Sequence, residues 1–103
     1  MASRERVLLD LNNPEFLEVF LRLDSGELRQ VVAALDRIRK LDWSTLVRHH
    51  GLKWEALSHL QTPNGSRAYS LRLSQKMRAV AYRDGSFLRL VSLHPDHDSA
   101  SDG

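Results

Sequence analysis

The sequence predicts an α+β fold, in which an N-terminal strand and an antiparallel helical hairpin pack on a three- to four-stranded antiparallel sheet. Two patterns predict it. Apolar residues recur with the helical period up to about residue 50, and with the strand period of two from about residue 53 onward. The length of 103 residues suits one hydrophobic core. We therefore expect a single domain over residues 1–98, with residues 99–103 as a frayed tail.

The N-terminal region predicts a short strand followed by a first helix. The strand is an apolar run at residues 6–11. Asn13 suits the N-cap of a helix and Pro14 suits its first position. From Phe16 to Leu23, apolar residues follow the spacing of one buried helical stripe.

A second helix begins after a short break, so the two helices are expected to form a hairpin. Asp24 and Glu27 have the spacing of a capping box, and apolar residues continue at helical spacing through Ile38. Residues 44–50 predict a brief third helix, with Gly51 as its stop.

The C-terminal half predicts the sheet. Residues 53–60 fit either a strand or an irregular rim, and the pattern does not decide between them. Residues 69–73 alternate apolar and polar side chains, as a half-buried strand does. Residues 77–83 and 86–93 flank Asp84-Gly85, a strong signal for a two-residue hairpin.

Charge is distributed unevenly along the chain, although the net charge is only +2. Residues 1–65 hold nine basic and nine acidic side chains, whereas residues 66–91 hold six basic side chains and one acidic. The last twelve residues add three aspartates. A basic block on a sheet is typical of a site for phosphate or for an acidic partner. The alternative is that its arginines only solvate an exposed face.

Two arginines of this block are the strongest candidates for a phosphate site. Alternation places Arg72 on the face opposite its apolar strand neighbours, and Arg78 lies on the adjacent predicted strand. Guanidinium groups on neighbouring strands can converge on one phosphate, because each forks onto its oxygens. The other basic side chains of the block are expected to bind RNA phosphates at longer range: Arg67, Lys76, Arg83 and Arg89.

Two histidines follow the last predicted strand. His94 and His97 lie beside Asp96 and Asp98, and imidazole is the side chain best suited to proton transfer near neutral pH. With arginines nearby, these groups suit transesterification of RNA, in which cations stabilise the charged phosphorane. The alternatives are a metal site or a solvated acidic tail. Because adjacent positions on an extended tail seldom converge on one ion, we expect no metal and no cofactor.

Several other classes of protein are excluded by composition and motif. The chain has no cysteine, which removes disulfide scaffolds and thiolate zinc sites and fits a cytoplasmic protein. No apolar run is long enough to span a bilayer, so we expect no membrane association. Walker, dinucleotide-binding and nucleophile-elbow motifs are absent. Trp43 and Trp54 fit core or rim packing better than platforms for stacking bases.

The strand motifs at residues 69–74, 77–79, 83–85 and 90–93, with the ending at 96–100, resemble the RelE/ParE superfamily of bacterial type II toxins, in particular its RelE/HigB-like members. The resemblance covers nearly the whole chain. It implies a ribosome-dependent messenger-RNA endoribonuclease that inhibits translation by metal-independent attack of the ribose 2′-OH. It also implies a cytoplasmic protein that takes part in plasmid stabilisation.

The same resemblance implies partners and site residues. A cognate antitoxin with a small acidic segment neutralises such a toxin, in a hetero-oligomer of the two chains. Arg72, Arg78, His94 and His97 fall at catalytic positions. Ser101 stands where relatives commonly have tyrosine, and a serine neither stacks on a base nor serves well as an acid. The resemblance therefore leaves two alternatives: a ParE-like gyrase inhibitor, or a catalytically weakened toxin-like binding protein.

Overall fold

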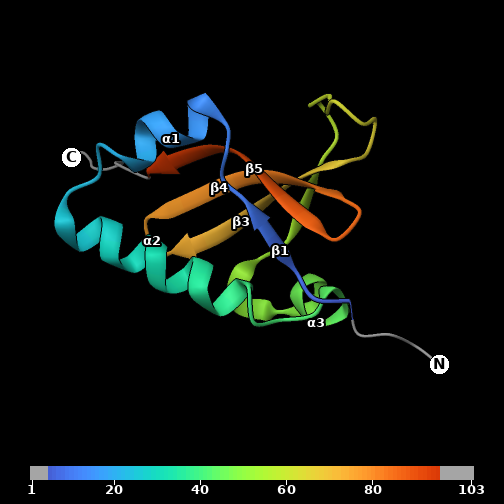
Figure 1. Ribbon diagram of the computed structural model, residues 1–103, viewed down its shortest axis with the longest axis horizontal. Helices are drawn as coiled ribbons and strands as arrows, with labels where there is room; N and C mark the ends of the chain where they lie inside the picture. The colour runs from blue at the N-terminus through green and yellow to red at the C-terminus, as the bar shows by residue number, and fades with distance from the viewer. Residues whose placement is uncertain (1–4, 96–103) are drawn as a thin grey trace.

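A five-stranded mixed sheet with the order β1-β5-β4-β3-β2 is the frame of the computed structural model, which describes residues 5–95 (Figure 1). The strands are β1 (Leu8–Asp10), β2 (Glu55–Leu57), β3 (Ala68–Ser74), β4 (Met77–Asp84) and β5 (Phe87–Pro95). The helices are α1 (Pro14–Phe20), α2 (Ser25–Ile38), α3 (Trp43–Arg48) and a short 3₁₀ helix, η1 (His50–Leu52). The predicted α+β class is confirmed.

The sheet differs from the prediction in the number and direction of its strands. β1 pairs in parallel with β5, while all other neighbours are antiparallel. The expected three- to four-stranded antiparallel sheet is therefore a five-stranded mixed one. A parallel pair needs a long crossover connection, and the whole chain between β1 and β5 supplies it. The undecided segment at residues 53–60 contains β2, which pairs with the start of β3.

Both predicted helix starts are confirmed by their caps. The Asn13 side chain accepts a hydrogen bond from the backbone N–H of Glu15 at 2.9 Å, and Asp24 accepts one from Glu27 at 2.8 Å. The predicted stop at Gly51 is wrong. α3 ends at Arg48, and the chain turns only after η1, at Lys53, whose φ of 49° is left-handed.

The β4–β5 hairpin is shifted by one residue from its prediction. Asp84 still pairs with Phe87 in the ladder, so the loop consists of Gly85 and Ser86. Gly85 has a φ of +62°, and a glycine at the first loop position matches the twist of the two strands. Asp84 is thus left in the strand, where its carboxylate binds Arg89.

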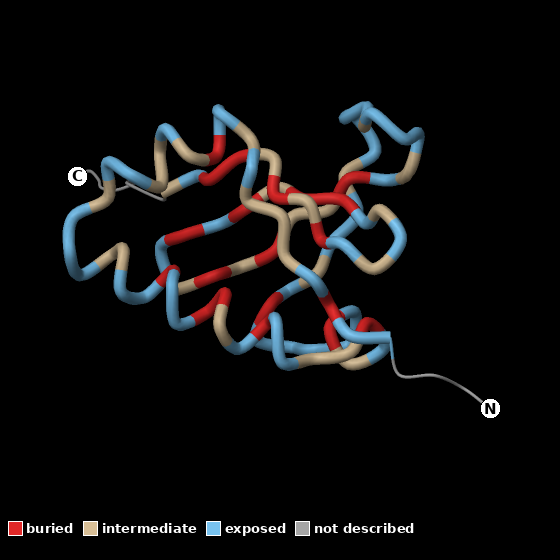
Figure 2. Tube along the Cα trace, viewed as in Figure 1, coloured by how far each residue is buried: buried red, intermediate tan, exposed pale blue. Residues whose placement is uncertain are grey.

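One face of the sheet is covered by the helices and holds the core (Figures 1 and 2). α1 packs on β5 and α2 on β3. The buried side chains of the helices are Phe16, Val31, Ala34, Leu35, Ile38, Trp43, Leu46 and Leu52, and those of the sheet include Leu71, Leu73, Ala79, Ala81, Leu88, Leu90 and Leu93. The opposite face carries the exposed Arg78 and His94 and the partly exposed Ser70 and Arg72, which are accessible for binding, while Ala68, Tyr82 and Ser92 are buried on it.

Within residues 5–95, no helix has the length and apolar composition needed to cross a membrane.

Candidate phosphate-binding site

Three candidate residues lie in one row across the sheet. Arg72 on β3 pairs with Arg78 on β4, and Arg78 pairs with His94 on β5. Directly paired residues on antiparallel strands point to the same face. The register therefore places two guanidinium-bearing residues and an imidazole next to one another on the uncovered face. We call these three residues the arginine–histidine row.

A β-bulge at Val91 brings His94 into this row. Ala81 pairs with Leu90, while the preceding Val80 pairs with Ser92, so Val91 is an extra residue in β5. Strict alternation would place His94 on the same face as Leu90, which is 2% exposed in the core. After the bulge, Leu93 takes the core side instead and His94 is exposed beside Arg78. Bulges frequently re-aim a side chain in this way.

Arg78 and His94 line a common cavity of about 490 Å³, which we call the Arg78 cavity. The Oγ atom of the buried Ser92 lies 2.8 Å from Nε2 of His94. This hydrogen bond orients the ring, and within residues 5–95 no hydrogen bond is made by Nδ1 of His94. The cavity therefore combines an oriented imidazole with a guanidinium.

Arg72 reaches a different hollow. β2 pairs only with the first residues of β3, from Ala68 to Ser70, so the segment around Arg72 is a free edge. There Arg72 lines a hollow of about 410 Å³ together with Arg37, Lys40 and His49. It is therefore a neighbour of Arg78 in the sheet without lining the Arg78 cavity.

The two arginines of the row have no counter-charge among the described residues. Within residues 5–95, neither Arg72 nor Arg78 forms an ion pair or a side-chain hydrogen bond. Like charges placed opposite one another on adjacent strands destabilise a sheet. Repulsion between the two arginines therefore lowers the stability of the fold, and a bound anionic ligand would reduce this repulsion.

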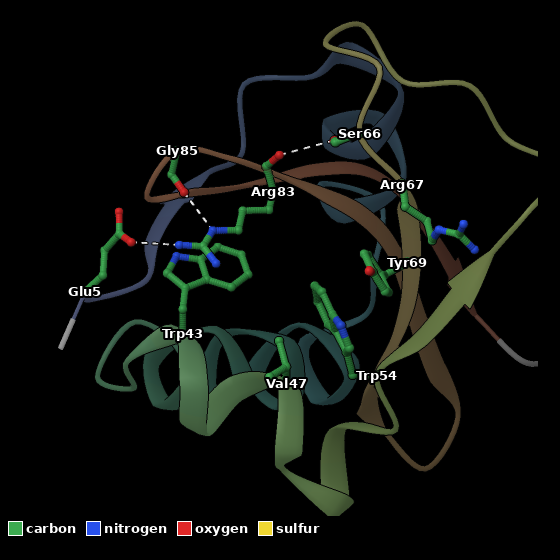
Figure 3. Close-up of a pocket in the computed structure, with 9 residues that line it drawn as sticks. All are labelled: Glu5, Trp43, Val47, Trp54, Ser66, Arg67, Tyr69, Arg83 and Gly85. Atoms are coloured by element: carbon green, nitrogen blue, oxygen red, sulfur yellow. Dashed lines mark hydrogen bonds and ion pairs between the residues drawn. The ribbon is translucent and has the colours of Figure 1, made fainter. Parts of the chain in front are cut away.

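Arg83 is held by its own chain (Figure 3). Its Nη2 atom lies 2.7 Å from a carboxylate oxygen of Glu5, and its Nε donates to the carbonyl of Gly85 at 2.8 Å. Its guanidinium carbon lies 4.3 Å from the centre of the Trp43 ring. The structure therefore does not bring Arg83, an expected phosphate-binding residue, to the arginine–histidine row.

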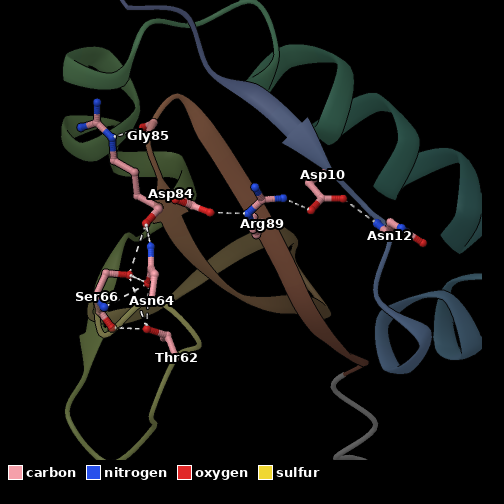
Figure 4. Close-up of polar contacts among 9 residues, drawn as sticks. Asp10, Asn12, Thr62, Asn64, Ser66, Asp84, Gly85 and Arg89 are labelled. Carbon is pink, nitrogen blue, oxygen red and sulfur yellow. Dashed lines mark hydrogen bonds and ion pairs between the residues drawn. The ribbon is translucent and has the colours of Figure 1, made fainter.

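Arg89 is also held in ion pairs by carboxylates of its own chain (Figure 4). It forms ion pairs with Asp84, at 2.8 Å, and with Asp10 on β1. These carboxylates raise the pKa of Arg89, through the hydrogen bond with Asp84 first and that with Asp10 second. Its role is to tie β1 and the hairpin to β5, and it is not free to bind RNA phosphate.

The pKa of Asp10, one of the two carboxyl groups that bind Arg89, is lowered. The largest cause is the hydrogen bond from the backbone N–H of Asn12, at 2.9 Å; partial burial opposes it, and Arg89 adds to the lowering. The charged form of Asp10 is therefore favoured in the folded protein.

The remaining expected residues lie away from the row or outside the described range. Lys76 is exposed in the β3–β4 turn, and Arg67 is exposed just before β3. Neither forms an ion pair within residues 5–95. His97 and Ser101 lie outside the described residues.

Three polar residues near the row were missed by sequence reasoning. Glu15 and His59 line the Arg78 cavity, and Glu55 pairs with Ser70 on the same face of the sheet. Because residues 53–60 did not indicate a definite element, nothing in the sequence set Glu55 or His59 apart. Only the pairing of β2 with β3 brings this segment to the site.

An α+β domain whose uncovered sheet face carries an oriented histidine and two arginines without an ion pair in the described part of the chain defines a candidate anion-binding protein. No protein-family profile matches the sequence, and neither does any curated protein.

Solved structures similar to the chain include the following two. The RelE–RelB complex from Pyrococcus horikoshii OT3 matches with a TM-score of 0.60 and 13% identity, over 94% of this chain and 100% of that one. The YoeB dimer from Staphylococcus aureus matches with a TM-score of 0.51 and 18% identity, over 93% of this chain and 100% of that one. The chain has the RelE-like fold, as the sequence predicted.

Proposed function

We propose that the chain is the toxin of a toxin–antitoxin pair and that it cleaves messenger RNA on the ribosome. Two findings support the proposal. The RelE-like fold extends over nearly the whole chain. The observation that carries it is the unpaired guanidinium of Arg78 beside the oriented imidazole of His94 in one cavity.

The chemistry of these groups suits attack of a ribose 2′-OH on the adjacent phosphorus. A base removes the 2′-OH proton, the 2′ oxygen bonds to phosphorus, and the bond to the 5′ oxygen breaks while an acid protonates that oxygen. The products are a 2′,3′-cyclic phosphate and a 5′-OH. His94 is the candidate for proton transfer, and Arg78 for stabilising the charge that develops on the phosphorane.

The uncompensated charge of the row also suits an antitoxin partner. An acidic segment of that protein would lie over Arg72 and Arg78 and occupy the position of the RNA phosphates, in a hetero-oligomer of the two chains. The acidic segment would neutralise the charges of Arg72 and Arg78, as RNA would. Binding of the antitoxin therefore excludes binding of RNA.

A ribosome-programmed cleavage assay tests the proposal. We expect Arg78→Gln and His94→Gln each to reduce cleavage strongly, and the loss of one stabilising cation to raise the barrier by about 2–4 kcal/mol. Arg22→Gln is the matched control, because Arg22 is exposed in the turn after α1, in an ion pair with Glu18 at 3.0 Å. Full cleavage by Arg78→Gln would remove the role assigned to that residue.

The cleavage assay, together with an assay of DNA gyrase inhibition, separates the alternatives. Absence of cleavage by the wild type, combined with inhibition of DNA gyrase, would assign the chain to gyrase-directed toxins. Absence of both activities would leave a toxin-like binding protein. In that case Ser101→Tyr tests whether only an aromatic group is missing, since restored cleavage would show that the arginine–histidine row is competent.

A further inference from the structure

A second cavity, of about 510 Å³, lies at the end of the sheet near α3, and both tryptophans of the chain line it (Figure 3). Tyr69 pairs with Ala81, whose side chain is buried on the helix face. Tyr69 therefore points away from the face that carries Arg78. We call this cavity the tryptophan slot.

Flat π surfaces form the two sides of the tryptophan slot. Figure 3 shows Arg83 and Trp43 on one side, with Tyr69 and Trp54 on the other. The guanidinium of Arg83 lies 4.3 Å from the centre of the Trp43 ring. The rings of Trp54 and Tyr69 are stacked, with centroids 4.2 Å apart and an angle of 18° between planes. The two sides meet at the tryptophans, whose rings are in T-shaped contact, with centroids 6.1 Å apart and an angle of 76° between planes. A planar group can therefore stack on the face of Tyr69 that Trp54 does not cover, or on the face of the Arg83 guanidinium that Trp43 does not cover.

Hydrogen bonds hold these surfaces in place. Trp43 donates from its indole nitrogen to the carbonyl of Ser86 at 2.9 Å. Arg83 is fixed by Glu5 and by the Gly85 carbonyl. Because the side chains are already ordered, a ligand loses little binding energy in arranging them.

The charge around the tryptophan slot favours an anionic ligand. Its single carboxylate, on Glu5, is engaged by Arg83 and Ser86. Arg67 is exposed at the rim, with no ion pair inside the described part of the chain. A ligand with both a planar ring and a negative charge satisfies these features, and a nucleotide has both.

The tryptophan slot is linked to the Arg78 cavity by a shallower hollow of about 290 Å³ along residues 57–67. That hollow shares Ser66 and Arg67 with the slot, and Leu57 and Leu60 with the Arg78 cavity. A single strand can thus follow this loop from one face of the sheet to the other.

We propose that the tryptophan slot stacks a base of single-stranded RNA, within the same strand whose phosphate lies at Arg78. The inference rests on the proposed function, because that proposal identifies the bound nucleic acid as messenger RNA. Stacking of bases on aromatic side chains is tolerant of sequence, so the slot would add affinity for RNA without selecting a base.

Tryptophan fluorescence tests this inference directly, because the only two tryptophans both line the slot. The probe is 2′-O-methyl hexaadenylate, which lacks a free 2′-OH and is not cleaved. We expect it to quench the emission of the wild-type protein. Tyr69→Leu should weaken its binding, measured by anisotropy of the labelled probe, by about tenfold. Arg67→Glu, an exposed substitution that spares the packing, should also weaken it.

The control is Phe87→Leu, since Phe87 is an exposed aromatic residue on β5 outside the slot, with Arg89 over its ring. This variant should bind the probe as the wild type does. Unchanged emission, or wild-type affinity in both Tyr69→Leu and Arg67→Glu, would overturn the inference. Tryptophan emission that changes with an acidic peptide but not with the RNA probe would assign the slot to a protein partner. That result would also overturn the inference.

Failure of the proposed function is distinguishable from failure of the slot. If quenching and the Tyr69→Leu effect are observed but ribosomal cleavage is absent, the slot stands and the nuclease proposal fails. If cleavage depends on Arg78 while emission does not respond to the probe, the nuclease proposal stands and the slot fails.

Discussion

Removal of the Arg78 charge should stabilise the fold while it strongly reduces the proposed RNA cleavage. Arg72 and Arg78 are paired across β3 and β4, and neither has a carboxylate partner within residues 5–95. In Arg78→Gln the side chain is shorter but stays polar, and the repulsion between the two guanidinium groups is lost.

The size of the gain follows from the geometry of a cross-strand pair. Directly opposite β carbons lie ~5 Å apart, and we take the splayed guanidinium groups as ~7 Å apart. Two unit charges at ~7 Å in water repel by roughly 0.6 kcal/mol, which physiological salt reduces to less than half. We therefore expect Arg78→Gln to raise the free energy of unfolding by about 0.2–0.6 kcal/mol, a rise of roughly 1–4 °C in Tm for a domain of this size.

Thermal and urea unfolding at low and high salt measure this effect. The gain should be largest at low ionic strength and vanish near 1 M salt, where the Debye length falls to about 3 Å. Arg22→Gln, the ion-paired control in the turn after α1, should show no gain at any salt concentration. The slope of the urea transition should not change, since the variant exposes no new surface on unfolding.

Two results would refute the reasoning. A gain that persists at high salt would not come from repulsion between charges. A clear loss of stability in Arg78→Gln would mean that the arginine supports the fold, and reduced cleavage by that variant would then report a structural defect. A stable but inactive variant is the outcome expected of a residue retained for binding an anion.

The remaining predictions concern the core, the histidine and pH. Phe16→Ala, which empties a fully buried position between α1 and β5, should cost about 3–5 kcal/mol of unfolding free energy by urea titration. Ser92→Ala should keep its Tm within a few degrees yet lower cleavage, because His94 loses the hydrogen bond that orients it; wild-type cleavage would contradict that role. The lowered pKa of Asp10 adds stability above its unfolded value of 3.8 that is lost as the pH falls through the folded pKa. Acid titration of Asp10→Asn should therefore show a smaller loss of stability below about pH 4, and an unchanged acid transition would rule the contribution out.

Local patterns in the sequence determined the elements of this fold. The caps at Asn13 and Asp24 depend only on side chains and backbone groups within three residues, so they could be predicted from spacing alone. The alternation in β3 likewise predicted that Arg72 leaves the buried face. Helix and strand periods report burial on one side, and that is why the α+β class could also be predicted.

Tertiary structure alone decided which of these groups meet. The bulge at Val91 reverses the alternation of β5 and sets His94 beside Arg78. Pairing of β2 with β3 brings His59 to the Arg78 cavity, and Arg83 and Arg89 are neutralised by carboxylates nearly eighty residues away in the sequence. Register, bulges and long-range ion pairs depend on contacts between distant segments, and no local pattern of residues encodes them.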